Sequence, residues 1–466
     1  MGRQAVRMAA RASLLLLVWS SPSAQGEEGQ GTAGDVARLE ALLLEDMRRE
    51  NVPGMAVAAV RGDRVVFAKG LGVANIETHA PVTADTLFQV GSVTKSFTAA
   101  AVLTLAERGT LDLDKPVGDY VDGLRPRIAR LRLRQLLNHT AGLQDEAAEY
   151  GEHGESALGE YQRTWGDEYA FLEPGSTFSY SNAGYALAGL AVQEATGKPY
   201  ADAMKELVFA PLSMNSATFR PTLAMTYPLA VGHQVADRPT VVRPLPNDTR
   251  LWPAGTFYAS ANDMARFALA MLGGGRVEGN AGLSPAVIRR MTTATTDVPG
   301  LPNATRYGVG VMLQTRRGLR EMGHDGQMTG YTATWRLFPD HRLAVVILCN
   351  KDGQRMDTMV DRVREFFVPE VMQADIQPKP IVPMDDEGLR RYVGTYTAPN
   401  RFSTEIVVRE GRIYLNQFNQ ETPMTPVGDG VFMVPTPAPR EIVFVRDAAG
   451  TPIFLQQFYW AFKKVR

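Results

Sequence analysis

The sequence predicts an α/β domain whose mostly antiparallel sheet is flanked by helices and carries a helical subdomain, followed by a small C-terminal antiparallel β-barrel. Three observations support this prediction. Strand-like segments occur near both ends of residues 27–372, a long section rich in helix signals separates them, and about eight short alternating segments follow a proline-rich linker. The chain has 466 residues, 45% of them hydrophobic, which is enough for more than one core.

Residues 1–26 have the pattern of a secretory signal peptide. Three arginines precede a short apolar run from Ser13 to Trp19, and small residues follow, so we expect cleavage between Ser23 and Glu27. The run is too short to span a bilayer, and no later run has membrane length. We therefore expect an exported protein, periplasmic or extracellular, without a transmembrane span.

The first domain, residues 27–372, begins with a helical pattern that Pro53 ends. Two apolar strands follow over residues 54–72, and the next apolar segment, "SVTKSFTAAAVLTLAERG", is typical of a buried helix. Helix signals and loops fill residues 110–290, and strand patterns return over residues 306–350. Because successive strands are joined by tight turns, the sheet is expected to be mostly antiparallel and built from both ends of the domain.

The linker, residues 373–388, is rich in proline and dotted with charges. Residues 389–466 alternate apolar and polar side chains between turn signals such as Gly428-Asp429-Gly430, without a helix pattern. We expect this barrel to have its own core and to fold apart from the first domain.

Composition excludes several classes of function. The formal net charge of −1, with no long basic run, argues against a nucleic-acid partner. The six histidines are scattered without metal-ligand spacing, so no metal and no cofactor are expected. The single cysteine, Cys349, lies in an apolar strand pattern and is expected to be a core residue. The expected partner is a small-molecule or peptide substrate.

Ser92 and Lys95 stand one turn apart at the start of the buried helix. Ser92 alone is compatible with an N-cap, and Lys95 with a side chain that extends to solvent. A lysine in so apolar a helix is costly, however, unless it has a partner or a chemical role. A desolvated lysine has a lowered pKa and can take the proton of a serine nucleophile, so the pair is a candidate catalytic centre.

Two further segments carry candidate groups. "SYSNAGYALAGL" places Tyr180, Ser181 and Asn182 before an apolar helix, where a phenol can relay protons and an amide can hold a carbonyl; a helix cap beside a core tyrosine is the alternative. In "MGHDGQMTGYTATW", strand alternation places His324 and Gly326 on one face and Asp325 on the other.

In this last segment, the backbone N–H of Gln327 is a candidate donor to the oxyanion of a reaction intermediate. The alternative interpretation of the segment is a β-turn with a surface histidine. For His139, in "LLNHTAGL", we favour a helix terminus stopped by Gly142.

These segments, S-x-x-K, Y-S-N and H-x-G in that order, resemble the three motifs of the penicillin-recognising serine hydrolases. That family includes class C β-lactamases, D-alanyl-D-alanine carboxypeptidases, D-amino-acid peptidases and β-lactamase-fold esterases, and the resemblance covers about residues 39–367. The terminal barrel is similar to the lipocalin-like domain of some members. The resemblance implies a β-lactamase/transpeptidase-like fold.

The resemblance also implies roles for individual residues. Ser92 would form the acyl-enzyme, Lys95 and Tyr180 would share the proton transfers, and Asn182 would orient the substrate. The N–H groups of Ser92 and Gln327 would form the oxyanion hole, beside His324 and Gly326.

His324 stands where the β-lactamases carry a lysine, which disfavours a dedicated β-lactamase. The expected function is a secreted serine hydrolase of esters, amides or peptides. The alternatives are a β-lactamase and a penicillin-binding or sensor protein that stays acylated.

Overall fold

An eight-stranded antiparallel sheet joins strands from both ends of the first domain, in the order β2-β1-β12-β11-β10-β9-β8-β7. The computed structural model describes residues 33–146, 148–236, 238–277, 279–369, 379–398, 402–435 and 440–465. The predicted signal peptide therefore lies outside the described residues, as does the linker up to residue 378. The strands are β1 (Gly54–Arg61), β2 (Arg64–Gly72), β7 (Thr296–Asp297), β8 (Arg306–Tyr307), β9 (Met312–Arg316), β10 (Leu319–Met328), β11 (Tyr331–Phe338) and β12 (Leu343–Cys349).

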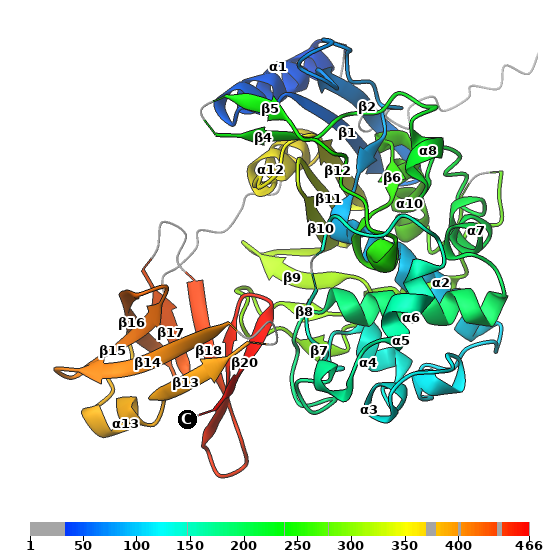
Figure 1. Cartoon of the computed structure of the whole chain (residues 1–466). Coiled ribbons are helices and arrows are strands. Elements are labelled where there is room, and N and C mark those ends of the chain that lie inside the picture. Colours follow the sequence, from blue (N-terminus) through cyan, green and yellow to red (C-terminus); the bar gives the residue numbers. More distant parts are fainter. Residues whose placement is uncertain are drawn as a thin grey trace, which may run out of the picture.

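Helices cover both faces of this sheet (Figure 1). Alternate side chains of β1 divide between two cores: Val57 packs with α1 (Ala33–Arg49) and α12 (Asp357–Phe367), whereas Ala58 faces α2 (Thr94–Glu107) and α10 (Ala261–Leu272). Both faces are apolar because each side of the strand is buried. Cys349 is buried in the first of these cores, as the sequence predicts.

The middle of the chain forms a helical subdomain beside the sheet (Figure 1). Its largest helix, α6, follows the second motif and packs against α2. The helices of this section are α3 (Pro126–Ala129), α4 (Leu133–Leu137), α5 (Ala157–Arg163), α6 (Asn182–Thr196), α7 (Tyr200–Met204), α8 (Pro221–Ala224), α9 (Trp252–Gly255) and α11 (Pro285–Thr292). The short strands β3 (Phe88–Gln89) and β6 (Tyr258–Ala259) pair with each other, as do β4 (His233–Val235) and β5 (Pro239–Val241).

The C-terminal strands close into an eight-stranded barrel. They are β13 (Gly394–Thr397), β14 (Ser403–Arg409), β15 (Arg412–Gln417), β16 (Gln420–Gly428), β17 (Val431–Val434), β18 (Arg440–Arg446), β19 (Pro452–Gln457) and β20 (Trp460–Lys464). A short helix, α13 (Asp386–Arg390), precedes them, at the end of the segment predicted to be linker. The barrel has an apolar core around Phe432 and Phe444. The predicted fold class, an antiparallel α/β domain followed by a small barrel, is confirmed.

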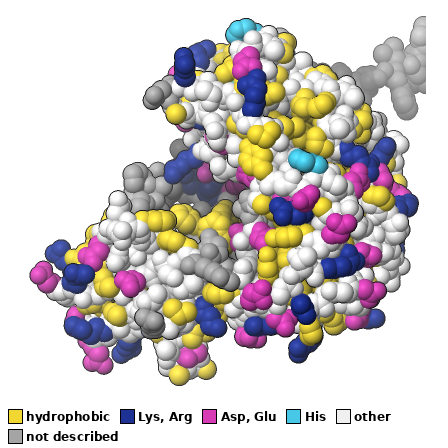
Figure 2. All heavy atoms as spheres, in the orientation of Figure 1, with side chains coloured by type: hydrophobic (Ala, Val, Ile, Leu, Met, Phe, Trp, Pro, Cys, Tyr) yellow, Lys and Arg dark blue, Asp and Glu magenta, His cyan; other side chains and the backbone are white. Residues whose placement is uncertain are grey.

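The barrel packs against the first domain through β19 and β20. Tyr459 and Trp460 join an apolar cluster with Phe178 and Tyr307, and Phe454 and Ala461 join another with Leu172. The expectation of a barrel with its own core holds, but its end is also part of cores shared with the first domain. Figure 2 shows the surface hollowed where the two parts meet. Among the described residues, none of the helices is long and apolar enough to cross a membrane.

Candidate active site

Ser92 lies in a 3₁₀ turn, Gly91–Val93, that leads directly into α2. The helix carries no side-chain cap, so Ser92 is not the N-cap that the simpler interpretation assigns to it. Gly91 has φ of 54°, and a Cβ there would lie 2.5 Å from the backbone nitrogen of Gln327. Only glycine therefore allows the turn to approach β10 this closely.

Lys95 is fully buried, and three acceptors surround its Nζ atom. It donates hydrogen bonds to Ser92 Oγ at 2.9 Å, to Asn182 Oδ1 at 2.7 Å and to the carbonyl of Ala254 at 2.6 Å. Burial lowers the pKa of Lys95 to about 7, against the opposing charge of Asp145. A neutral amine beside a serine hydroxyl can act as its general base.

Tyr180 lies on the other side of the nucleophile. Its phenol is near enough to Ser92 for that hydroxyl to influence its pKa, and Lys95 Nζ lies 4.8 Å from the centre of its ring. Burial raises the pKa of Tyr180 well above its ordinary value, although the neighbouring Ser92 hydroxyl opposes the change. The phenol is therefore protonated at neutral pH, and Lys95 is the group of this pair that changes charge near pH 7.

Asn182 is held by a carboxylate that the sequence analysis missed. Ser181 caps α6 by accepting from the N–H of Gly184, so Asn182 begins the helix. Asp145 Oδ1 accepts from the backbone N–H of Asn182 at 2.9 Å and from its Nδ2 at 3.0 Å. Because a carboxylate only accepts, it orients the amide with Oδ1 toward Lys95.

His139 lies at the C-terminus of α4, as the sequence predicts, and its side chain is also a buried neighbour of the site. Its ring stacks on Tyr180, and its Nδ1 accepts from the N–H of Ser181 at 3.1 Å. Burial, with the nearby charge of Lys95, holds the pKa of His139 well below its ordinary value, so the ring is neutral. His139 has a left-handed φ of 60°, which turns the chain away from the axis of α4.

The third motif lies on β10, whose backbone faces the nucleophile turn. A Cβ at Gly326 would lie 1.9 Å from the carbonyl oxygen of Val90 and 2.9 Å from the nitrogen of Ser92. Gly326 thus lets the backbone from Gly326 to Gln327 approach Ser92 closely. This brings together the two segments whose N–H groups are the candidate oxyanion donors.

His324 is buried, and both of its ring nitrogens have protein partners. Nδ1 lies 2.6 Å from the carbonyl of Asp325 and Nε2 lies 3.0 Å from the hydroxyl of Tyr307. A carbonyl only accepts, so Nδ1 carries the proton and Nε2 accepts from Tyr307. Burial, with the charge of Lys95, lowers the pKa of His324 to about 4, which leaves this position uncharged at neutral pH.

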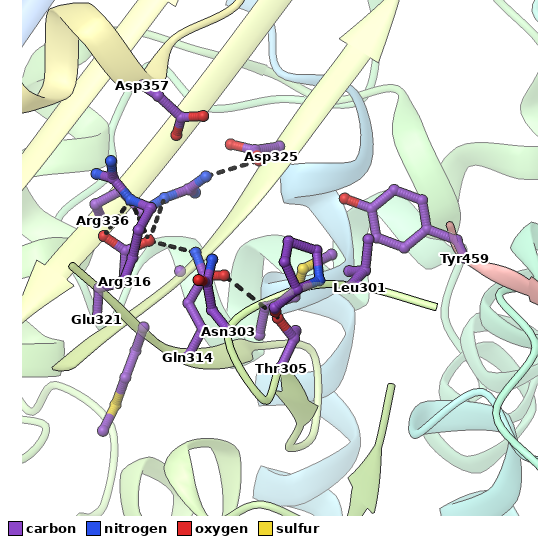
Figure 3. A pocket seen from close by; sticks show the side chains of 14 residues that line it. Leu301, Asn303, Thr305, Gln314, Arg316, Glu321, Asp325, Arg336, Asp357 and Tyr459 are labelled. Carbon is purple, nitrogen blue, oxygen red and sulfur yellow. Dashed lines mark hydrogen bonds and ion pairs between the residues drawn. The ribbon is translucent and has the colours of Figure 1, made fainter. Parts of the chain in front are cut away.

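Asp325 points away from Ser92, as strand alternation predicts. It accepts from Arg336 at 2.7 Å and lines a separate cavity of about 190 Å³ (Figure 3). Arg316, Glu321 and Asp357 also line this cavity, and Tyr459 of the barrel lies at its edge. The charge of Asp325 is therefore compensated by Arg336, on the side of β10 that faces away from Ser92.

The cavity at Ser92 is small, about 70 Å³, and is bordered by two carboxylates, Glu146 and Glu149. Glu146 accepts from the hydroxyls of Tyr161 and Tyr169, each at 2.7 Å, and Glu149 accepts from the N–H of Thr329 at 2.9 Å. The remaining lining residues are Ala148, Asn182, Leu251, Ala254, Gly255, Thr256, Gln327 and Met328. Within the described part of the chain, no group of three or more acidic, histidine or cysteine side chains is arranged to hold a metal ion.

The structure therefore brings together Ser92, Lys95, Tyr180 and Asn182, with Gly326 and Gln327 against them and His324 behind Tyr180. Sequence reasoning did not assign Asp145 or Trp460 to the site, and it placed His139 only at a helix terminus. Asp145 sits in an acidic loop that resembles a solvated surface segment, and Trp460 follows a hairpin turn in the barrel. Only a signal of contact between distant segments would have found them.

Comparisons with known proteins agree with this geometry. The "Beta-lactamase" family model matches residues 39–367. The chain is 29% identical over 368 residues to Penicillin-binding protein 4 of Amycolatopsis lactamdurans, covering 74% of this chain and 93% of the relative.

Two solved structures extend the comparison. The crystal structure of SurE matches with a TM-score of 0.76 at 25% identity, covering 93% of this chain and all of that chain. D-amino acid amidase from Ochrobactrum anthropi SV3, complexed with D-phenylalanine, matches with a TM-score of 0.58 at 26% identity, covering 72% of this chain and all of that one. With the family model matching well over half of its length, the chain belongs to the beta-lactamase family of serine hydrolases.

Proposed function

We propose that this protein is an exported serine hydrolase that cleaves esters or amides through an acyl-enzyme on Ser92. One observation carries the proposal: Ser92 Oγ lies 2.9 Å from Nζ of a buried lysine, and burial lowers the pKa of Lys95 to about 7. Such a lysine is an effective base at neutral pH, where an ordinary lysine is protonated. The basic and apolar start of the chain supports export.

The reaction begins with neutral Lys95 taking the Ser92 proton as Oγ attacks the substrate carbonyl. The oxyanion of the tetrahedral intermediate is held by the N–H groups of Ser92 and Gln327. The leaving alcohol or amine receives a proton from protonated Lys95, with Tyr180 as the relay, and departs. Water then attacks the acyl group on Ser92 and gives a proton to the same base. The base returns this proton to Ser92 Oγ as the acyl–Oγ bond breaks and the carboxylic acid is released.

The charges near the cavity favour substrates that carry an amine. Glu146 and Glu149 border the cavity, and His324 at the third motif is neutral. A free carboxylate would meet two negative charges there, whereas an ammonium group would be attracted. Amino-acid amides, esters and peptides held by their N-terminal amine are therefore preferred to penicillins and to D-alanyl-D-alanine termini. The fold likeness to an amidase that binds D-phenylalanine is consistent with this choice.

The second candidate is a β-lactamase or a penicillin-binding protein that stays acylated. It is favoured by the likeness to Penicillin-binding protein 4. Burst-and-stall kinetics with an activated ester, in which one equivalent of product forms and turnover stops, would support a penicillin-binding protein that stays acylated over a hydrolase.

The test is a panel of p-nitrophenyl esters, a chromogenic cephalosporin, and D-amino-acid p-nitroanilides with and without an N-acetyl group. We expect free amines to be cleaved faster than their N-acetyl counterparts. Glu149→Gln is expected to lessen that difference, with Glu152→Gln, an exposed carboxylate nearby, as the matched control. Equal rates for free and acetylated substrates would contradict amine recognition without contradicting the hydrolase itself.

A further inference from the structure

The end of the barrel contacts the segment that carries Tyr180. The backbone N–H of Tyr180 donates to the carbonyl of Tyr459 at 2.8 Å. Two residues earlier, the carbonyl of Phe178 accepts from Gln456 Nε2 at 2.8 Å, and the N–H of Ala461 donates to Ser179 Oγ at 3.3 Å. The β19–β20 hairpin is thus hydrogen-bonded to the backbone and side chains of residues 177–180.

From this hairpin, Trp460 reaches the charged group behind Asn182. Its Nε1 donates to Asp145 Oδ2 at 2.9 Å, across 315 positions of sequence. The other oxygen of Asp145 holds both nitrogens of Asn182, whose Oδ1 accepts from Lys95. A continuous chain of hydrogen bonds therefore runs from the barrel to the catalytic lysine.

The charged state of Asp145 depends on the hydrogen bonds from these donors. Burial raises the pKa of Asp145, and the hydrogen bonds from Asn182 and Trp460 oppose that rise. A carboxylate that loses a donor in such a place is destabilised or takes up a proton. A displaced or protonated Asp145 no longer fixes the Asn182 amide, and the amide then no longer holds Lys95 against Ser92.

We propose that Trp460 of the barrel is a positioning residue for Lys95, acting through Asp145 and Asn182. The barrel is thus part of the catalytic machinery rather than an appended module. This inference rests on the proposed hydrolase function, because its effect is seen as turnover. The competing interpretation is that Trp460 only packs the two domains together, as its apolar neighbours Tyr307 and Tyr459 would allow.

The test is Trp460→Phe in the full chain, which keeps an aromatic ring and removes the N–H. We expect kcat for a p-nitrophenyl ester to fall about 10- to 100-fold, the size of effect that misplaced catalytic groups produce, while KM changes little. The matched control is Phe462→Leu, also on β20, whose side chain lies in the barrel core. We expect Phe462→Leu to lower the melting temperature without affecting Asp145, and to leave kcat unchanged.

A double-mutant cycle separates positioning from packing. If Trp460 acts through Asp145, then Trp460→Phe should cost little further kcat in an Asp145→Ala background. Additive losses, or a kcat for Trp460→Phe that matches Phe462→Leu, would overturn the inference. A wild-type protein that hydrolyses no ester or amide and takes up no fluorophosphonate label would instead reject the proposed function.

Discussion

The imidazole of His139 lies on the phenol ring of Tyr180, with ring centres 4.2 Å apart and 26° between the planes. The same imidazole accepts the N–H of Ser181, so it holds the second motif at two adjacent residues. Its neutral state is required for that bond, because a protonated ring has no acceptor nitrogen. His139 is therefore a support for Tyr180 rather than a group that meets substrate.

His139→Ala should destabilise the fold by about 2–4 kcal/mol, because it removes a buried ring and leaves the Ser181 N–H without its acceptor. Urea unfolding measures the loss. His79→Ala is the matched control, because His79 has a similar left-handed φ of 58° but is exposed. Equal losses in both variants would show that the effect comes from backbone conformation alone.

Acid should destabilise the wild type through the same residue. The folded-state pKa of His139 is below its unfolded value, so below about pH 6.5 the unfolded chain binds more protons than the folded one. The stability contributed by the neutral ring is therefore present above pH 6.5 and lost as the pH falls. Urea midpoints from pH 8 to pH 5 should decline more in wild type than in His139→Ala.

Ser92→Ala should abolish hydrolysis and covalent labelling by a fluorophosphonate, with a rate loss on the order of 10⁶-fold. Ser96→Ala, one turn further along α2, should keep the label on Ser92, because Ser96 donates to the carbonyl of Gly310 instead. Mass spectrometry of the labelled peptide locates the adduct. A label elsewhere, or turnover above about a thousandth of wild type, would show that Ser92 is not the nucleophile.

The pH dependence of kcat/KM should follow Lys95. For a neutral ester, activity is expected to rise with pH through a midpoint near 7, because Lys95 must lose its proton to act as base. Asp145 raises the pKa of Lys95, so Asp145→Asn should move this midpoint to lower pH even as kcat falls. Asp122→Asn, an exposed carboxylate, serves as the control. A midpoint that stays in place would show that another group titrates.

Substrate preference should depend on position 324 and not on position 325. kcat/KM for an ester or an amino-acid amide is expected to exceed that for any β-lactam, and His324→Lys, alone or with Asp325→Thr, should narrow the gap by adding a cation for a carboxylate. Asp325→Thr alone should leave the ratio unchanged, because Asp325 faces Arg336. A wild-type enzyme that hydrolyses a cephalosporin faster than every ester and amide would refute this interpretation.

The sequence predicts the parts of the site that follow from local spacing. Ser92 and Lys95 are one helical turn apart, so their proximity needs no tertiary information. The closed barrel and the sheet built from both ends also follow from strand patterns and turn signals. Asp145, His139 and Trp460 could not be assigned in this way, since each acts on a residue 37 or more positions away. The expected independence of the barrel follows from its linker and from its own alternating core, and neither carries information about what the last hairpin contacts.

The pairing of β1 with β12 sets the order in which this molecule can form during synthesis. Met55 is opposite Cys349, so β1 can pair with β2 early, but its second neighbour, β12, is made almost three hundred residues later. Until then one edge of the β1–β2 hairpin has no partner strand, and its apolar faces have no completed sheet to join. Trp460 is synthesised later still, so a partly synthesised chain lacks the hydrogen bond from Trp460 to Asp145.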